Sequence, residues 1–481
     1  MNRSGRRRFG VLVVGLCLLL AGCGSRRSHA ELQSALVNQL PVVPAVASGA
    51  VPAAATANAA APATTAPAPA AVVAPTNVGS TSATTTPVAR AKTTHASGKS
   101  SLGGKTSPAR VSGCTGTEKP IALGAVGQQT GVAGAVVVNG PRMVSAWAAA
   151  TNAAGGLACH PVKYIIADDG GSPAKNASLV QQLVERDGVI AFVQMDDPLS
   201  YSGSEKYLVD HQIPVIGTDT SSDMVYNHPN FFPQASSGKY SVQGSVGAAS
   251  TSFSPDAKAH FAALSCQEIA ACTYMNDNAK QLADMFGLTL VYKGQVSITQ
   301  PDYTATCVAA KDAGAKGIFV ILDGNSVHRL ARSCTAVQYK PEFITPGTGV
   351  VASMLTDPNL NGFFQSVFVQ PFTNTANPMI AEMNATIAKY APGLDNFGQS
   401  PVGWTSAKLL EYAVQFLPAK DSWTSADIMA AMGKVKNYDV GGMTAPLTFA
   451  PGKNPEPFLC WFSTSIRDGK WVAVTAKRTC K

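Results

Sequence analysis

The chain has 481 residues, of which 46% are hydrophobic and 14% are charged, and its formal net charge is +8. The positive charge is confined to the N-terminal part, because residues 1–22 contribute +4 and residues 24–113 contribute +6, which leaves about −2 for the remainder. A nearly neutral remainder has no broad basic surface for a phosphate backbone, so these numbers exclude a nucleic-acid-binding protein.

The first residues predict export and membrane attachment. Four arginines between Arg3 and Arg8 precede the apolar run Phe9–Leu20, and Leu-Ala-Gly-Cys follows at 20–23. A basic segment, a short apolar run and small residues at the end are typical of a signal peptide. The ending resembles the lipobox of bacterial lipoproteins, which implies cleavage after residue 22 and lipidation of Cys23. An ordinary secretion signal or a membrane-spanning anchor with a chance cysteine is the alternative, but the 12 apolar residues are fewer than the roughly 20 that a spanning helix needs.

Residues 23–113 are rich in Ala, Pro and Thr. Such a segment buries too little apolar surface to offset its conformational entropy, and its prolines favour extended conformations. We therefore expect a disordered tether, whose basic residues lie near anionic lipid head groups beside the anchor.

From residue 120 onward, short apolar strands alternate with helices. This pattern predicts parallel sheets covered by helices on both faces, an α/β architecture. The region after residue 113 is too long for one core, so two lobes are expected. The expected strands are Ile121–Val126, Val162–Ala167, Ile190–Gln194, Pro214–Gly217, Cys272–Met275, Thr289–Lys293, Gly317–Leu322 and Glu342–Thr345. The expected helices are Val138–Ala154, Pro173–Asp187, Ser204–His211, Val242–Ser252, Ala279–Phe286, Tyr303–Ala313 and Ser326–Tyr339.

The chain has ten cysteines, and their number and positions agree with an exported protein. Cys17 leaves with the signal and Cys23 is the expected lipidation site, so eight remain, an even number that indicates disulfides in an exported chain. Eight cysteines allow 105 connectivities, and pairing of neighbours is the arrangement we expect: Cys114–Cys159, Cys266–Cys272, Cys307–Cys334 and Cys460–Cys480. A zinc site is the rival interpretation, but there is no Cys-x-x-Cys pair and the seven histidines are scattered, so no metal is expected.

Several segments, in this order along the chain, resemble those of type I periplasmic binding proteins. They are Lys119–Ala125 with Gln129–Gly131, Ala149–Gly156, Asp168-Asp169 with Asn176–Gln182, Asp302–Thr304 with Ala313–Ala315, and Met443–Pro451. The nearest branch is the leucine/isoleucine/valine-binding receptors of branched-chain amino-acid ABC transporters.

The resemblance implies two doubly wound, Rossmann-like lobes joined by three crossovers, with the ligand between them. Lobe 1 would comprise 114–238 with 370–439, and lobe 2 would comprise 239–369 with 440–481. The crossovers are expected near Ser236–Tyr240, Val369–Phe372 and Tyr438–Gly441. Ligands in such sheets bind outside the carboxyl ends of the strands.

The resemblance also implies where ligand would bind. The candidate ligand-binding residues are Gln129, Asp197, Thr218, Asp219, Thr220, Asn278, Asp323, Asn325 and Gly347. Asp196 or Asp197 stands in place of a serine in the relatives' loop, and the family's second-lobe acid is missing near Gly347. Either Asp197 or Asp219 then binds a ligand ammonium, or the ligand is not an α-amino acid. A further alternative is that these acids only cap helices. We expect a polar crevice for a polar, neutral or cationic solute.

The resemblance thus implies a lipid-anchored protein on the extracytoplasmic face of a bacterial cell membrane. It would deliver a small solute, an amino acid or another polar molecule, to an ABC permease. An envelope sensor or scaffold with the same fold is the alternative. Gly-x-Ser-x-Gly and His-Glu-x-x-His are both absent, so neither an enzyme nor a cofactor is expected.

Overall fold

The computed structural model describes residues 118–481 apart from 132 and 476. Clustering of contacts divides the chain into Met1–Ala96 and Ser97–Lys481, and every described residue belongs to the second unit. The signal, Cys23, the tether and Cys114 lie outside the described residues. Within them, no helix is both long and apolar enough to cross a membrane.

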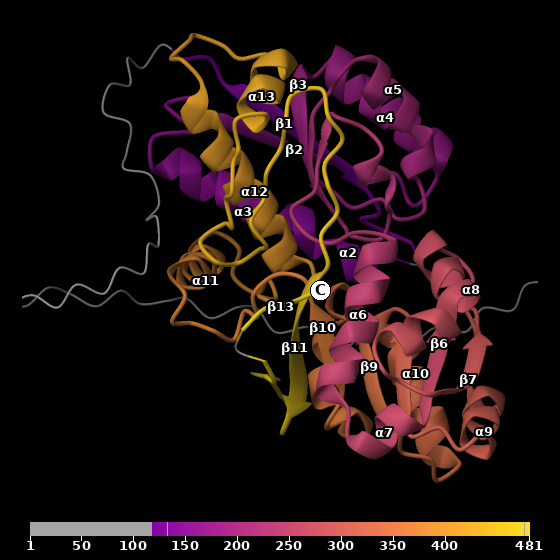
Figure 1. The fold of residues 1–481 in the computed structure, drawn as a ribbon. Helices are drawn as coiled ribbons and strands as arrows, with labels where there is room; N and C mark the ends of the chain where they lie inside the picture. The colour runs from indigo at the N-terminus through magenta and orange to yellow at the C-terminus, as the bar shows by residue number, and fades with distance from the viewer. Residues whose placement is uncertain (1–117, 132, 476) are drawn as a thin grey trace, which may run out of the picture. The chain divides into compact units, whose positions relative to one another are not determined.

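The first sheet has five parallel strands in the order β2-β1-β3-β4-β5 (Figure 1). Most residues of β1 and β3 are buried, as expected for strands that helices cover on both faces. The strands are β1 (Ile121–Gly127), β2 (Val162–Asp168), β3 (Val189–Met195), β4 (Val215–Thr218) and β5 (Phe231–Phe232).

Helices from two distant parts of the chain cover this sheet. In Figure 1, α4 and α5 lie on its right, and α3, α12 and α13 lie on its left. The helices α11 and α12 pack on α3, and α13 packs on β3, so the chain returns to the first sheet after building the second. The helices are α2 (Gly134–Val137), α3 (Asn139–Ala153), α4 (Pro173–Glu185), α5 (Glu205–Asp210), α11 (Pro378–Tyr390), α12 (Ser400–Ala413) and α13 (Ser425–Met432). Short 3-10 helices are η1 (Tyr201–Gly203), η2 (Met224–Tyr226) and η6 (Val414–Phe416).

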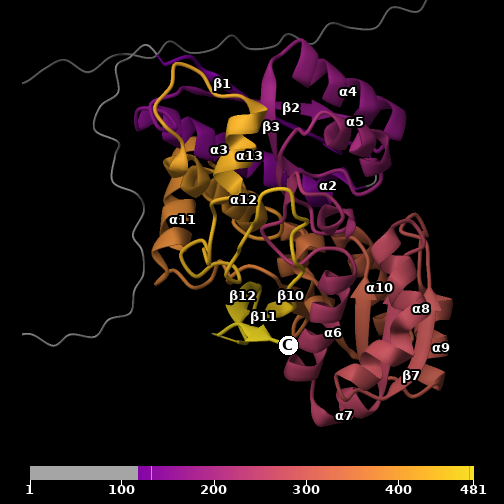
Figure 2. The ribbon, with the colours of Figure 1, turned by 45° about the horizontal axis from the view of Figure 1, so that its top comes forward.

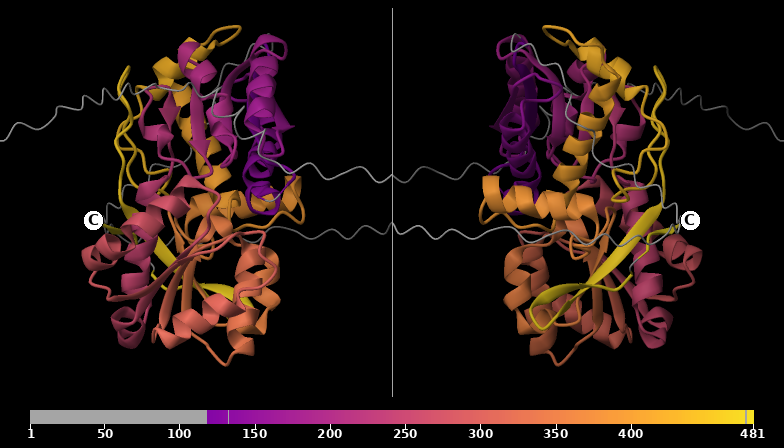
Figure 3. Two further views of the ribbon diagram at one scale, coloured as in Figure 1. Left: turned by 90° about the vertical axis from the view of Figure 1, so that its right-hand side faces the viewer. Right: turned by 90° about the vertical axis from the view of Figure 1, so that its left-hand side faces the viewer.

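The second sheet runs β12-β11-β10-β9-β8-β6-β7, with β13 paired to β11. Its strands from β6 to β10 pair in parallel, and β11 joins β10 antiparallel. The helix pairs α6/α8 and α9/α10 lie on opposite faces of this sheet (Figures 2 and 3). The strands are β6 (Phe261–Ser265), β7 (Leu290–Gln295), β8 (Gly317–Ile321), β9 (Glu342–Pro346), β10 (Phe364–Val367), β11 (Cys460–Arg467), β12 (Lys470–Ala473) and β13 (Thr479–Cys480). The helices are α6 (Lys239–Ser252), α7 (Pro255–Ala259), α8 (Ala270–Met285), α9 (Thr304–Asp312), α10 (Gly324–Ala336), and the 3-10 helices η3 (Gly347–Gly349), η4 (Ala352–Thr356) and η5 (Pro358–Leu360).

One expected strand is wrong. Residues Cys272–Met275 belong to α8, and the strand that begins the second sheet is β6, which we did not expect. The buried residues of α8 recur at helical spacing, as Cys272, Met275, Ala279, Leu282 and Ala283. The small residues of β6 hide its strand character because alanine has low strand propensity.

The third crossover lies later in the chain than expected. Tyr438 and Leu447 form an antiparallel β-bridge. The ring of Phe449 packs on that of Phe232 in β5, with 5.2 Å between the ring centroids. The chain therefore stays with the first sheet beyond Tyr438–Gly441. Ser236 Oγ then donates to the carbonyl of Phe458 at 2.9 Å, and β11 begins two residues later. The expected position of this crossover and the lobe boundary at residue 440 are therefore wrong.

Three disulfides join the partners expected from the sequence. Cys266–Cys272 links the residue directly after β6 to α8, Cys307–Cys334 links α9 to α10, and Cys460–Cys480 links β11 to β13. Cys159 is also disulfide-bonded, and its expected partner Cys114 lies outside the described residues.

Candidate functional site

A cavity of about 130 Å³ lies where the carboxyl ends of strands from both sheets meet. This is the location at which parallel α/β sheets bind ligands. Residues of the first lobe that line it come from α2, from the loops after β3 and β4, and from the turn before α12; they are Ala133, Val136, Val137, Pro198, Leu199, Asp219, Ser221 and Gln399. Residues of the second lobe that line it are the last residues of β8 and β9 or lie in the loops after β6 to β9; they are Cys266, Glu268, Ile269, Ile298, Ile321, Leu322, Asp323, Pro346, Thr348 and Gly349.

Most of the cavity wall is aliphatic. Val136 and Leu199 line it from the first lobe, and Ile298 and Ile321 line it from the second. The volume is close to that of a dry protein cavity of about 150 Å³ that binds benzene. The expectation of a polar crevice is therefore wrong, because apolar residues directly after the strands and on α2 supply most of the lining.

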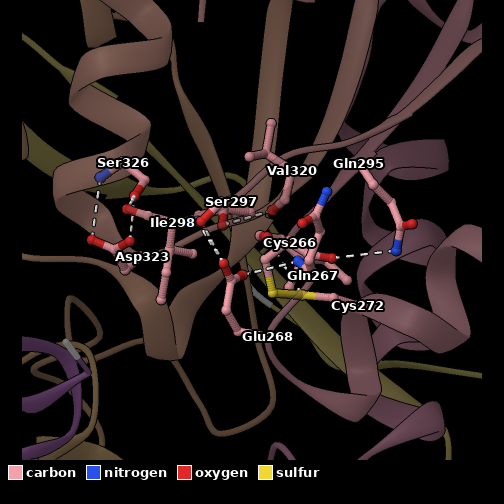
Figure 4. Close-up of a disulfide and its surroundings, with 12 residues drawn as sticks. Cys266, Gln267, Glu268, Cys272, Gln295, Ser297, Ile298, Val320, Asp323 and Ser326 are labelled. Carbon is pink, nitrogen blue, oxygen red and sulfur yellow. Dashed lines mark hydrogen bonds between the residues drawn. A yellow bond between two sulfur atoms is a disulfide. The ribbon is translucent and has the colours of Figure 1, made fainter. Parts of the chain in front are cut away.

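In the second lobe, the two carboxylates at the cavity are held by hydrogen bonds. Glu268 accepts from Ser297 Oγ at 2.7 Å and from the N–H of Ile298 at 3.1 Å, which ties the loop after β6 to the loop after β7 (Figure 4). The Cys266–Cys272 disulfide closes the same loop at its start. Asp323 caps α10 and accepts from the N–H groups of Asn325 and Ser326 at 3.0 and 3.2 Å. Both carboxylates therefore have an evident structural role.

The first lobe carries an acidic cluster of different character, formed by Asp169, Asp196, Asp197 and Asp219. All four side chains are at most 3% exposed. Asn176 Nδ2 donates to Asp169 and to Asp197 at 2.8 Å each. One carboxylate oxygen of each of Asp196, Asp197 and Asp219 has no hydrogen-bond partner. In the described part of the chain, no three His, Cys, Asp or Glu side chains are placed to hold a metal ion.

Burial changes the protonation of this cluster. Loss of hydration, followed by repulsion from Asp219, raises the pKa of Asp196 and of Asp197 well above the usual range. Burial also raises the pKa of Asp219 to about 6, although hydrogen bonds from Ser221 and Tyr201 oppose that change. Asp219 is the member of the cluster that lines the cavity, so a buried carboxyl group with a raised pKa lies at the cavity wall.

Two of the nine candidate ligand-binding residues, Asp219 and Asp323, line the cavity, and the other seven do not. Asp197 and Thr218 are buried behind the wall, at 0% and 1% exposure. Thr220 is 2% exposed and has φ of +72°, an uncommon conformation for a β-branched residue. Its carbonyl accepts from the N–H of Gly238 at 3.0 Å, which ties the loop after β4 to the first crossover.

The remaining four candidates lie elsewhere. The N–H of Gln129 donates to Asp168 Oδ1 at 2.9 Å, and its side chain is absent from the cavity lining. Asn278 lies within α8, where its side chain donates to the carbonyl of Tyr274, and the strand expected before it is part of the same helix. Asn325 borders a different cavity. Gly347 packs against Val367 and Gln365 and has no side chain to offer.

The residues that we missed are mainly apolar. Val136 and Val137 lie on α2, a four-residue helix that is too short to give a periodic signal. Pro198 and Leu199 directly follow the two aspartates after β3, and Ile298 follows β7. Their positions after strand ends could have identified them as lining residues, because ligands in such sheets bind outside the carboxyl ends of the strands.

Comparisons with known proteins agree on the fold. The chain is similar in structure to a possible leucine/isoleucine/valine-binding protein from Rhodopirellula baltica, with 17% identity, a TM-score of 0.64, and coverage of 76% of this chain and 98% of that one. A fatty acid ABC transporter substrate-binding protein from Thermomonospora curvata has 15% identity, a TM-score of 0.63, and coverage of 76% and 93%. A branched-chain amino acid ABC transporter protein from Thermus thermophilus with bound valine has 14% identity, a TM-score of 0.64, and coverage of 76% and 97%.

A search of curated proteins found no match. The family model described as "Periplasmic binding protein" matches residues 120–470, which include both sheets up to the start of β12. With this match and the two-sheet fold, the chain belongs to the periplasmic binding protein family.

Proposed function

We propose that the protein is a lipid-anchored, extracytoplasmic solute-binding protein that captures a small apolar amine between its lobes and delivers it to an ABC permease. Family membership and the ABC transporter proteins among its structural neighbours support solute binding for transport. The lipobox-like ending at Cys23 supports the anchor.

The observation that carries the ligand class is the charge of the cavity wall. Its charged lining residues are Asp219, Glu268 and Asp323, and no Lys, Arg or His is among the described residues that line it. A ligand carboxylate would lie near these acids and would meet repulsion, whereas an ammonium group would be attracted. The aliphatic wall and the volume of about 130 Å³ suit a body the size of a benzene ring.

Asp219 is the residue that we expect to receive the ammonium group. Its Oδ2 atom has no hydrogen-bond partner, whereas Oδ1 accepts from Ser221 N and Ser221 Oγ at 2.8 Å each. Glu268 and Asp323 already accept several hydrogen bonds from their own lobe. An ammonium donor would satisfy the free oxygen of Asp219 and favour its ionised form.

Calorimetric titration of the full-length protein with three ligands of one shape tests this proposal: benzylamine, benzyl alcohol and benzoate. We expect benzylamine to bind at least about tenfold more tightly than benzoate at pH 7.5, since a tenfold ratio needs only about 1.4 kcal/mol. Leucine and valine extend the panel. Stronger binding of benzoate, leucine or valine than of benzylamine would contradict the proposed ligand class.

A further inference from the structure

A second group of polar side chains lies in the second lobe, at a cavity that shares no lining residue with the ligand cavity. His328, on α10, contacts Ser353 through one ring nitrogen and Asp357 through the other. Ser353 Oγ lies 2.9 Å from His328 Nε2, and Asp357 Oδ2 lies 2.8 Å from His328 Nδ1. A hydroxyl, an imidazole and a carboxylate in this sequence match the arrangement of nucleophile, base and orienting group in serine hydrolases.

The hydrogen bonds determine which ring nitrogen carries the proton. Burial alone would raise the pKa of Asp357, but hydrogen bonds from His328 and Asn359 outweigh it and lower that pKa. An ionised carboxylate only accepts hydrogen bonds, so His328 Nδ1 is the donor to Asp357. In the neutral imidazole, Nε2 is then the acceptor and receives the hydroxyl proton of Ser353.

The surroundings expose the hydroxyl and shield its partners. Ser353 is exposed on η4, whereas the side chains of His328 and Asp357 are 10% and 4% exposed. The cavity has a volume of about 630 Å³ and is also lined by Asn325, Arg329 and Arg332. Arg332 has its Nε 3.5 Å from Asp357 Oδ2, and its side chain is 68% exposed. Arg332 therefore adds positive charge beside Asp357, and it lines the same cavity as the Ser353 hydroxyl.

We propose that Ser353, His328 and Asp357 form a catalytic triad that hydrolyses small acyl esters at this second cavity. Ser353 Oγ attacks the ester carbonyl carbon and its proton passes to His328 Nε2. Collapse of the tetrahedral intermediate breaks the bond to the alkoxide, which leaves as the alcohol with that proton, and the acyl group remains on Ser353. Water then attacks the acyl carbon and gives a proton to His328, and the serine regains a proton as the carboxylic acid leaves.

No local sequence motif indicates this site, because its three residues come from three different elements of the chain. His328 lies on α10, Ser353 on η4, and Asp357 caps η5. The proposal is independent of the solute cavity, so failure of either proposal leaves the other in place.

The first test is covalent labelling of the full-length protein with a fluorophosphonate probe, in which the serine oxygen displaces fluoride. We expect peptide mass spectrometry to find the label on Ser353, and we expect Ser353→Ala to remove it. Ser202→Ala is the matched control, because Ser202 is also exposed on a 3-10 helix and no histidine among the described residues forms a hydrogen bond with it. Absence of label on Ser353 in the wild-type protein would overturn the proposal.

The second test is the hydrolysis of p-nitrophenyl acetate. Ser353→Ala, His328→Gln and Asp357→Asn should each lower the rate at least about 100-fold, the lower end of what a positioned base contributes. Ser202→Ala should retain the wild-type rate. Equal hydrolysis by wild type and Ser353→Ala, with matching melting curves, would show that this network only holds η4 and η5 against α10.

Discussion

The two walls of the solute cavity hold their carboxylates in different ways. In the second lobe, Glu268 and Asp323 accept backbone and hydroxyl hydrogen bonds, so their charge stabilises a loop and a helix terminus. In the first lobe, Asp219 is 3% exposed, has one oxygen without a partner, and lies near Asp196 and Asp197. A carboxylate whose oxygens accept hydrogen bonds from its own loop or helix has a structural role, whereas a buried carboxylate with an unpaired oxygen at a cavity indicates a ligand-binding role.

The largest expected effect that tests this contrast is on amine binding. Asp219→Asn keeps the shape of the side chain and removes its charge, so benzylamine affinity should fall at least about 30-fold, the lower end for loss of one partner of a buried charge pair. Calorimetric titration at pH 7.5 measures the change. Asp312→Asn, at an exposed position on α9, is the control and should bind as the wild type does.

The same substitution should stabilise the empty protein. The folded-state pKa of Asp219 is about 6 and its ordinary value is 3.8, so ionisation destabilises the fold as pH rises from about 4 through about 6. Asp219→Asn should therefore raise the free energy of unfolding at pH 7.5 by up to about 3 kcal/mol, and by less at pH 5. Urea unfolding at both pH values measures the gain. An unchanged or lower stability at pH 7.5 would show that the carboxylate of Asp219 is not strained by burial.

Amine binding should depend on pH through the same group. An ammonium ligand pairs with the ionised form of Asp219, so its affinity should fall about tenfold between pH 7.5 and pH 5. Asp196, Asp197 and Tyr201 face Asp219 within the first lobe, and Glu268 and Asp323 lie across the cavity. Asp219→Asn should flatten the profile. A pH dependence retained in that variant would assign it to one of these other groups.

The smallest expected effect is in the second lobe. Asp323→Ala removes the N-terminal cap of α10 and should lower the free energy of unfolding by about 1 kcal/mol. Asp427→Ala is the matched control, since it removes part of the capping box of α13, which is not at the cavity. Both variants should lose similar stability in urea, and benzylamine affinity should change less than about threefold. A large loss of affinity for Asp323→Ala alone would make that acid a ligand-binding group.

Much of the fold could be predicted because its signals are local. Alternating apolar strands and helices predicted two parallel sheets, and the segments from Lys119 to Pro451 carried the family resemblance. The strand Phe261–Ser265 was not predicted because its small residues give a weak strand signal. Cys272–Met275 was predicted as a strand, although its buried residues continue the helical spacing of α8. The third crossover was misplaced because the contact between Phe232 and Phe449 joins residues that are far apart in the chain.

The candidate site was predicted less well than the fold. Asp219 and Asp323 follow strands and line the cavity, but Asp197 and Thr220 also follow strands and are buried behind its wall. The sequence shows which residues follow a strand, but the backbone path of each loop decides which of them reach the cavity. For the same reason, the aliphatic character of the wall could not be derived from the polar residues alone.

By itself, the amino-acid sequence determined the α/β class and three cysteine pairs, Cys266–Cys272, Cys307–Cys334 and Cys460–Cys480, because each depends on residues close together in the chain. It also predicted an export signal at the N-terminus. Only the tertiary structure decided that aliphatic residues of two lobes line the cavity, that Asp219 is the acid of the first-lobe cluster that lines it, and that His328 lies between Ser353 and Asp357. The physical reason is that burial, pKa and cavity shape depend on which distant segments pack together, and local patterns do not contain that information.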